Sequence, residues 1–126
     1  MAGEQILVVE DNEKNMKLFR DVLQAAGYRT LEATTGGRAV ELANEHRPDL
    51  VLMDVQLPDL NGLEVLGRLR ANARTASIPV LAVTAQAMQG DRERFLAAGF
   101  DAYVSKPVNI VELVATAKHH CDRGGR

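Results

Sequence analysis

Four short apolar runs recur along the chain, and each leads into a polar residue. Ile6–Val9 precedes Glu10 and Asp11, Leu50–Met53 precedes Asp54, Val80–Val83 precedes Thr84, and Tyr103–Val104 leads through Ser105 to Lys106. Continuous runs of Val, Leu and Ile are typical of strands buried on both faces of a parallel sheet. The segment Arg29–Ala33 instead alternates polar and apolar residues, which predicts a half-exposed edge strand.

Helical periodicity fills the intervals between these strands. Apolar residues recur every three or four positions there, which predicts helices that each bury one face. The predicted helices cover residues 16–26, 36–46, 63–69, 89–98 and 110–117. Gly27 and Gly99 follow two of them and are suited to the left-handed residue that ends a helix.

The order of the predicted elements is a strand followed by a helix, repeated five times. Such alternation implies a parallel sheet with right-handed crossovers and helices on both faces. We therefore predict an α/β fold with a doubly wound, five-stranded parallel sheet. We place the domain at residues 5–121 and expect loose ends at residues 1–4 and 122–126.

The composition is that of a single globular domain in a reducing compartment. With 126 residues, 46% of them hydrophobic and 25% charged, the chain is typical of one globular domain. No apolar run approaches the roughly 18 residues of a membrane span, and no signal-peptide pattern is evident. The lone Cys121 excludes an internal disulfide and fits a reducing compartment. We expect a cytoplasmic protein.

Charge excludes some partners and points to a site. The net charge of −2 argues against non-specific binding to nucleic acid or membranes. Acidic residues are nevertheless concentrated in the first half, where residues 1–64 hold 12 acidic and 6 basic side chains. Closely spaced carboxylates there would need a cation to remain ionised together.

The polar residues that follow the strands are the candidate chemistry. Ligands bind at the carboxyl ends of strands in open parallel sheets. Glu10, Asp11, Asp54, Thr84 and Lys106 should therefore meet at one edge of the sheet. Three carboxylates so placed repel unless a cation lies among them, and oxygen ligands favour a hard divalent ion, Mg²⁺ first or Mn²⁺.

Each of these residues also has an ordinary structural interpretation. Asp11 or Asn12 could cap a helix, and Thr84 could cap the next helix along the chain. Asp54 could be a loop acid before the Pro58-Asp59 turn, and Lys106 a solvated loop lysine. The position of all these residues at the ends of separate strands favours a functional site.

At this point the motifs resemble a known family. Glu10-Asp11, Asp54 with Pro58 and Gly62, Thr84-Ala85, Tyr103 and Lys106-Pro107 are similar to the pattern of the response-regulator receiver domain. The resemblance covers residues 5–121. It implies the CheY-like arrangement of the flavodoxin type, with strand order 2-1-3-4-5, and a cis Lys106–Pro107 bond.

The resemblance also implies roles for the site residues. Asp54 would accept a phosphoryl group, with Lys106 and Thr84 contacting the phosphoryl oxygens. Mg²⁺ would be held by Asp11, by Asp54 and by the backbone carbonyl of Gln56, and by Glu10 through water. Gln56 and Gln86 would flank the acceptor and the hydrolytic water. Such a domain is not an enzyme in the usual sense, since it catalyses only its own phosphotransfer and autodephosphorylation.

The implied function is a single-domain response regulator that switches partner binding. The phosphoryl donor would be a histidine kinase or a histidine phosphotransfer protein. Thr84 and Tyr103 would move together on phosphorylation, and a downstream protein would bind the face made by residues 87–98, 102–104 and 109–120. Stretches within residues 9–28 resemble stand-alone receivers of bacterial cell-division control.

Two alternatives remain open. Residues 84–94 also resemble receivers attached to hybrid histidine kinases, which would make this domain a phosphorelay intermediate. A Mg²⁺-dependent phosphatase could likewise use Asp54 as a nucleophile, although Gln56 stands where dehalogenase-type phosphatases need an acid.

The glycine pair Gly36-Gly37 is not a candidate phosphate-binding loop, because the residues around it do not form a phosphate-binding motif.

Overall fold

The computed structural model describes residues 3–85 and 90–124, with side chains described as far as residue 121. Five parallel strands form one sheet in the order β2-β1-β3-β4-β5. Their bounds are β1 Gln5–Val9, β2 Arg29–Ala33, β3 Leu50–Asp54, β4 Val80–Thr84 and β5 Ala102–Ser105. The predicted α/β class, strand number and strand order are confirmed, and β2 is an edge strand as its alternating pattern predicts.

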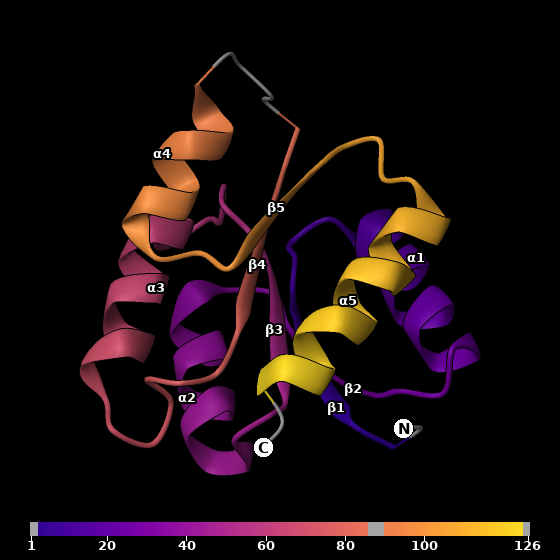
Figure 1. Ribbon diagram of the computed structural model, residues 1–126. Helices are drawn as coiled ribbons and strands as arrows, with labels where there is room; N and C mark the ends of the chain where they lie inside the picture. The colour runs from indigo at the N-terminus through magenta and orange to yellow at the C-terminus, as the bar shows by residue number, and fades with distance from the viewer. Residues whose placement is uncertain (1–2, 86–89, 125–126) are drawn as a thin grey trace.

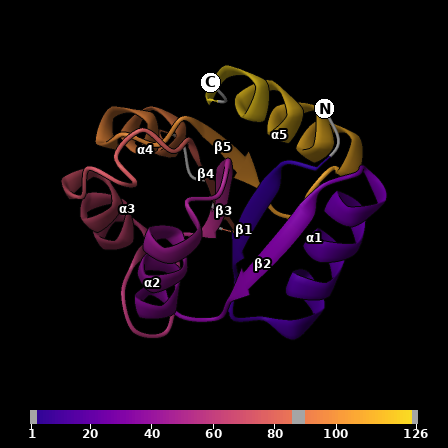
Figure 2. The same ribbon diagram turned by 90° about the horizontal axis from the view of Figure 1, so that it is seen from below.

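Helices cover both faces of the sheet (Figure 1). Their bounds are α1 Glu13–Ala25, α2 Gly36–His46, α3 Gly62–Ala71, α4 Asp91–Ala98 and α5 Ile110–Gly124. Figure 2 shows α1 and α5 on one side of the sheet and α2, α3 and α4 on the other. Among the described residues, no helix combines the length and the apolar character needed to cross a membrane.

Alternate residues of each central strand enter opposite layers of the core. On β1, Leu7 and Val9 pack toward α2, α3 and α4, whereas Ile6 and Val8 pack toward α1 and α5. All four are at most 1% exposed. Because successive side chains point to opposite faces, a strand between two helical layers needs an unbroken apolar run. That requirement explains the runs in β1, β3 and β4.

Local signals fix most helix ends. Asn12, rather than Asp11, is the N-cap of α1, since its side chain accepts a hydrogen bond from Asn15 N at 3.0 Å. Gly27 and Gly99 follow α1 and α4 with φ of 100° and 117°, so both occupy the left-handed conformation that glycine tolerates. The Lys106–Pro107 bond is cis, as the family resemblance implies.

Backbone hydrogen bonds and helix continue beyond residues 5 and 121, the predicted bounds of the domain. Gly3 N donates to Gly27 O at 2.9 Å, and Arg29 N donates to Glu4 O at 2.9 Å. These bonds extend the pairing beside β1 to residues 3 and 4. At the other end α5 continues to Gly124, three residues beyond the predicted boundary. Helix α4 begins at Asp91, and the predicted start at Gln89 lies outside the described residues.

Candidate functional site

The carboxyl edge of the sheet carries the predicted polar residues. Glu10 directly follows β1, Asp54 ends β3, Thr84 ends β4, and Lys106 directly follows β5. The parallel register places neighbouring strand ends side by side, with Thr84 opposite Ser105 and Asp54 opposite Val83. The site is thus a product of sheet topology rather than of one contiguous motif.

Three carboxylates meet at this edge. Oxygen atoms of Glu10, Asp11 and Asp54 all lie within 4.8 Å of one another. Glu10 is 1% exposed and Asp54 is 6% exposed, whereas Asp11 is exposed. Burial raises the pKa of Glu10; hydrogen bonds from Lys106 and from Asn12 N lower it but do not cancel that effect, and the charge of Asp54 adds to the rise.

Lys106 supplies the positive charge that faces these acids. Its Nζ atom lies 2.9 Å from Glu10 Oε1 and 3.3 Å from Asp54 Oδ2. Burial by itself would lower the pKa of Lys106, but the hydrogen bonds and charges of Glu10 and Asp54 outweigh burial and raise the pKa. The ammonium is therefore retained at neutral pH. One cation among three carboxylates leaves an excess of negative charge.

That excess fits a bound divalent cation. The donors are carboxylate oxygens, the ligand type that Mg²⁺ and Mn²⁺ prefer, and the exposed Asp11 leaves one side of the group open to solvent. Like charges at this spacing would otherwise favour protonation of one acid. The residues present therefore fit the predicted metal.

The loop after β3 contacts the Asp54 side chain. Gln56 N donates to Asp54 Oδ1 at 2.9 Å, so both carboxylate oxygens of Asp54 have partners, Gln56 on one and Lys106 on the other. The loop then closes on itself, because Gly62 N donates to Val55 O at 2.9 Å and Gln56 pairs with Asn61 in an isolated bridge. The carboxylate is held in a defined orientation.

Thr84 is buried at the end of β4, with 2% of its surface exposed. It does not cap the next helix, since the N-cap of α4 is Gly90 and has no side-chain hydrogen bond. Thr84 O accepts a hydrogen bond from Lys106 N at 2.8 Å. The ends of β4 and β5 are thus tied together at the site. Gln86 lies outside the described residues.

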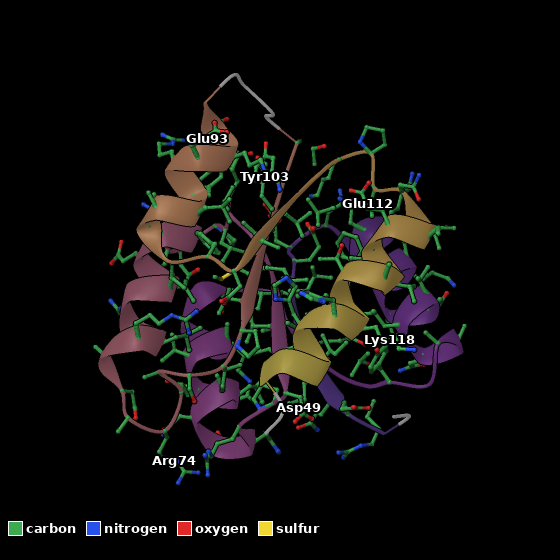
Figure 3. The ribbon with its side chains drawn as sticks, in the orientation of Figure 1. Asp49, Arg74, Glu93, Tyr103, Glu112 and Lys118 are labelled. Atoms are coloured by element: carbon green, nitrogen blue, oxygen red, sulfur yellow. The ribbon has the colours of Figure 1, made fainter. Side chains whose placement is uncertain are left out.

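Tyr103 lies on β5 beside α4 (Figure 3). Its ring stacks on Phe95 with a centroid distance of 5.6 Å and an interplanar angle of 26°. The hydroxyl oxygen is buried and has no hydrogen-bond partner among the described residues. Burial, and then the negative charge of Asp91, raise the pKa of Tyr103. A buried hydroxyl without a partner is costly, so the described residues alone do not stabilise the hydroxyl in this ring position.

Sequence reasoning missed one residue of this region. Asp59 is read from the sequence as a turn residue, yet its carboxylate accepts hydrogen bonds from Gly36 N and Gly37 N at 2.7 and 2.9 Å. These bonds lower the pKa of Asp59. No local pattern pairs residues 22 and 23 positions apart, so only the folded chain reveals the contact.

Comparison with known proteins agrees with this geometry. The family pattern described as the response regulator receiver domain matches residues 6–118. The chain is 50% identical over 117 residues to the polar-differentiation response regulator DivK of Brucella anthropi, covering 93% of this chain and 95% of that protein. The corresponding protein of Brucella ovis is 49% identical over the same length.

Solved structures share the fold. The receiver domain of the sensor histidine kinase PA1611 from Pseudomonas aeruginosa is 38% identical, with a TM-score of 0.88 and coverage of 96% of this chain and 99% of that one. It was solved with a magnesium ion coordinated in its active-site cleft. The receiver domain of the Francisella response regulator 1452 has 27% identity, a TM-score of 0.88 and coverage of 95% and 98%.

Proposed function

This chain belongs to the response regulator receiver family, and we propose that it is a phosphorylatable switch whose phosphoryl acceptor is Asp54. The observation that carries the proposal is the surrounding of Asp54. A nearly buried carboxylate ends a central strand, with two further carboxylates within 4.8 Å and the Lys106 ammonium at 3.3 Å. A core needs no such group, whereas phosphoryl transfer needs an oriented nucleophile among balanced charges.

The proposed reaction transfers a phosphoryl group from a phosphohistidine of a histidine kinase or phosphotransfer protein. An oxygen of the Asp54 carboxylate attacks phosphorus and the P–N bond breaks. The electron pair stays on the imidazole, which takes up a proton, and the product is an aspartyl phosphate. Lys106 Nζ, which lies 3.3 Å from Asp54 Oδ2, neutralises charge on the phosphoryl oxygens. The hydroxyl of Thr84 donates a hydrogen bond to one of those oxygens.

The same residues would hold the metal. Asp11, Asp54 and the backbone carbonyl of Gln56 would coordinate Mg²⁺ or Mn²⁺ directly, and Glu10 through water. When bound, the ion supplies positive charge that stabilises the transferring phosphoryl group. Autodephosphorylation reverses the modification: water attacks phosphorus, the bond to the Asp54 oxygen breaks, and inorganic phosphate leaves. Gln56 orients or shields that water in this proposal, and so does Gln86, which lies outside the described residues.

We propose that phosphorylation is read out through Thr84 and Tyr103. The phosphate carries about −1.5 to −2 charges and three strong acceptors, which draw the Thr84 hydroxyl toward it. Tyr103 then changes its packing against Phe95. The Tyr103 hydroxyl has no hydrogen-bond partner among the described residues, which supports a ring that can change position. A population shift between two packings is the proposed switch.

The proposed surface for a downstream protein is the face of residues 87–98, 102–104 and 109–120. A cavity of about 510 Å³ lies between α4, β5 and α5 on this face, and Leu96, Tyr103, Thr116 and His119 contribute to its lining. Tyr103 thus belongs both to the proposed switch and to the proposed surface. Residues 87–89 lie outside the described residues.

Similarity to DivK proteins supports a role in cell-division and polar-differentiation control, and we propose that the protein acts in the cytoplasm. A specific observation favours a second candidate function. The receiver of a sensor histidine kinase is 38% identical to this chain, so the domain could pass its phosphoryl group onward in a phosphorelay. Transfer of label from phosphorylated Asp54 to a histidine phosphotransfer protein would identify that role.

The test of the proposed function is intact mass after incubation with acetyl phosphate, with and without Mg²⁺, on the wild type and on Asp54→Asn. We expect one Mg²⁺-dependent phosphoryl adduct on the wild type and none on the variant. Absence of an adduct on the wild type in Mg²⁺ would overturn the proposal. Steady consumption of acetyl phosphate without an adduct would instead indicate a phosphatase.

A further inference from the structure

The loop of residues 55–61 contacts the acceptor Asp54, and the Asp59 side chain hydrogen-bonds its outer tip to α2. Asp59 Oδ1 accepts from Gly36 N at 2.7 Å, and Asp59 Oδ2 accepts from Gly37 N at 2.9 Å. Both N–H groups belong to the first turn of α2, where N–H groups have no partner within the helix. One carboxylate therefore joins the loop after β3 to the start of α2.

The contact is closely packed as well as hydrogen-bonded. A Cβ atom at Gly36 would lie 2.7 Å from Val65 Cγ2 and 3.0 Å from Leu60 Cβ. A side chain at position 36 would thus crowd both α3 and the loop, so glycine lets the start of α2 approach them this closely. Leu60 follows Asp59 directly and packs against the core cluster that includes Val65. The loop tip is thus fixed on two sides, by the Asp59 carboxylate and by Leu60.

The opposite part of the loop contacts the reactive side chain. Gln56 N donates to Asp54 Oδ1 at 2.9 Å. Gln56 and Asn61 face each other in a bridge, so displacement of the tip is passed to Gln56 through a short, closed loop. Only two residues separate Gln56 from Asp59. The orientation of the Asp54 carboxylate consequently depends on where the tip is held.

We propose that Asp59 is a positioning residue for phosphoryl acceptance, acting through the Gln56 N–H on the Asp54 carboxylate. This inference rests on the proposed function of Asp54. It gives one role to two sequence features, the turn acid Asp59 and the Gly36-Gly37 pair, which hydrogen-bond to each other. It also links the start of α2 mechanically to the acceptor.

The competing explanation is that Asp59 only caps α2. The helix already has its own N-cap, because Thr35 Oγ1 accepts from Arg38 N at 3.2 Å. Thr35→Ala therefore removes a hydrogen bond from the same helix end without touching the loop of residues 55–61. It is the matched control for Asp59→Ala, and Asp59→Asn, which retains one acceptor oxygen, is the conservative variant.

The experiment has one kinetic and one spectroscopic measurement. The rate constant for Asp54 phosphorylation is measured by intact mass at saturating acetyl phosphate and Mg²⁺ for all four proteins. We expect a loss on the order of ten-fold for Asp59→Ala, a smaller loss for Asp59→Asn, and a change under about two-fold for Thr35→Ala. In metal-free protein, the Gln56 amide resonance should shift in Asp59→Ala and stay in place in Thr35→Ala.

Wild-type phosphorylation kinetics and an unshifted Gln56 resonance in both Asp59 variants would overturn the inference and leave Asp59 as a cap. If Asp59→Ala does not fold, Asp59→Asn supplies the same comparison. A failure of the proposed function is distinguishable, since it would be seen as a wild type that forms no Asp54 adduct. The metal-free resonance would still decide whether Asp59 positions the loop.

Discussion

Lys106 Nζ lies 2.9 Å from Glu10 Oε1, although the two residues are 96 positions apart in sequence. Glu10 directly follows β1, and Lys106 directly follows β5. In the sheet, β3 and β4 lie between those two strands. The two side chains therefore reach toward each other along the carboxyl edge, over the end of β3. Asp54 lies at that end and shares the same ammonium at 3.3 Å.

Loss of this ammonium should destabilise the metal-free protein. Lys106→Met leaves the buried Glu10 and Asp54 without their cation, and we expect a loss of about 1–3 kcal/mol in the free energy of unfolding at pH 7. Urea unfolding in the presence of a chelator measures it. Lys118→Met, on the exposed face of α5, is the control and should change little. Equal curves for both variants would show that the acids do not depend on Lys106.

Removal of one acid should have the opposite effect on the metal-free fold. Asp11→Asn relieves repulsion among carboxylates that lie within 4.8 Å, so we expect stabilisation of roughly 0.5–1 kcal/mol without divalent ions. Added Mg²⁺ should stabilise the wild type more than the variant. Thermal unfolding with and without Mg²⁺ tests both statements. Glu13→Gln, an exposed acid outside the cluster, should show no stabilisation, and a lower midpoint for Asp11→Asn would contradict the argument.

Close packing beside the acceptor can be probed with two glycines of α3. A Cβ atom at Gly62 would lie 2.7 Å from Val55 Cα, whereas one at Gly67 would meet no atom within 4 Å. We expect Gly62→Ala to lower the free energy of unfolding by about 1–3 kcal/mol. Gly67→Ala should be neutral or stabilising by up to about 1 kcal/mol. Similar stabilities for the two variants would disprove the close approach at Gly62.

The energetic effect of the buried Tyr103 hydroxyl, which has no hydrogen-bond partner within residues 3–85 and 90–121, can be measured. Tyr103→Phe removes that hydroxyl and keeps the stacking on Phe95, so we expect stability equal to the wild type or higher by up to about 1 kcal/mol. Tyr103→Leu, which loses the ring, should be destabilised by about 1 kcal/mol or more. Chemical denaturation of the three proteins gives the comparison. A clear loss in Tyr103→Phe would mean that the hydroxyl has a stabilising partner.

The carboxylate of Asp59 should make a pH-dependent contribution to stability. Hydrogen bonds from Gly37 N and Gly36 N lower its pKa in the folded state. Its contribution is therefore complete above the ordinary aspartate pKa of about 3.9 and is lost as pH falls through the lowered value. The wild type should exceed Asp59→Asn in stability at pH 6–7, and the gap should narrow in acid. A gap that is constant from neutral to acidic pH would exclude this charge effect.

Much of the fold and the core of the site follow from local sequence. The apolar runs of β1, β3 and β4 are long enough to require burial on both faces, so they identify central strands without any knowledge of their neighbours. The alternation of polar and apolar residues in Arg29–Ala33 identifies the edge strand, because only a strand that is half exposed can carry polar side chains on one face. Because parallel strands bring their carboxyl ends to one edge, Glu10, Asp54 and Lys106 could be grouped before the fold was known.

Element boundaries were less well determined, for a physical reason. Ser105, Thr84 and Asp54 are polar, so an apolar pattern ends before them, yet the hydrogen bonds of the sheet include them in their strands. Likewise α5 continues to Gly124, past the last apolar residue of its buried face, since backbone hydrogen bonding does not need a hydrophobic side chain. Periodicity records which side chains are buried and not where backbone pairing stops.

The sequence by itself determined the fold class, the sheet order implied by the family pattern, and the residues that gather at the carboxyl edge. Short segments suffice for this, because their apolar pattern indicates which strands are buried and their order indicates which ends of the strands meet. Tertiary structure alone decided the contacts between distant segments. The Asp59 carboxylate on Gly36 and Gly37, and the Lys106 ammonium shared by Glu10 and Asp54, depend on the packing of whole elements. A hydrogen bond acts only within about 3.5 Å, and no spacing along the chain specifies that distance.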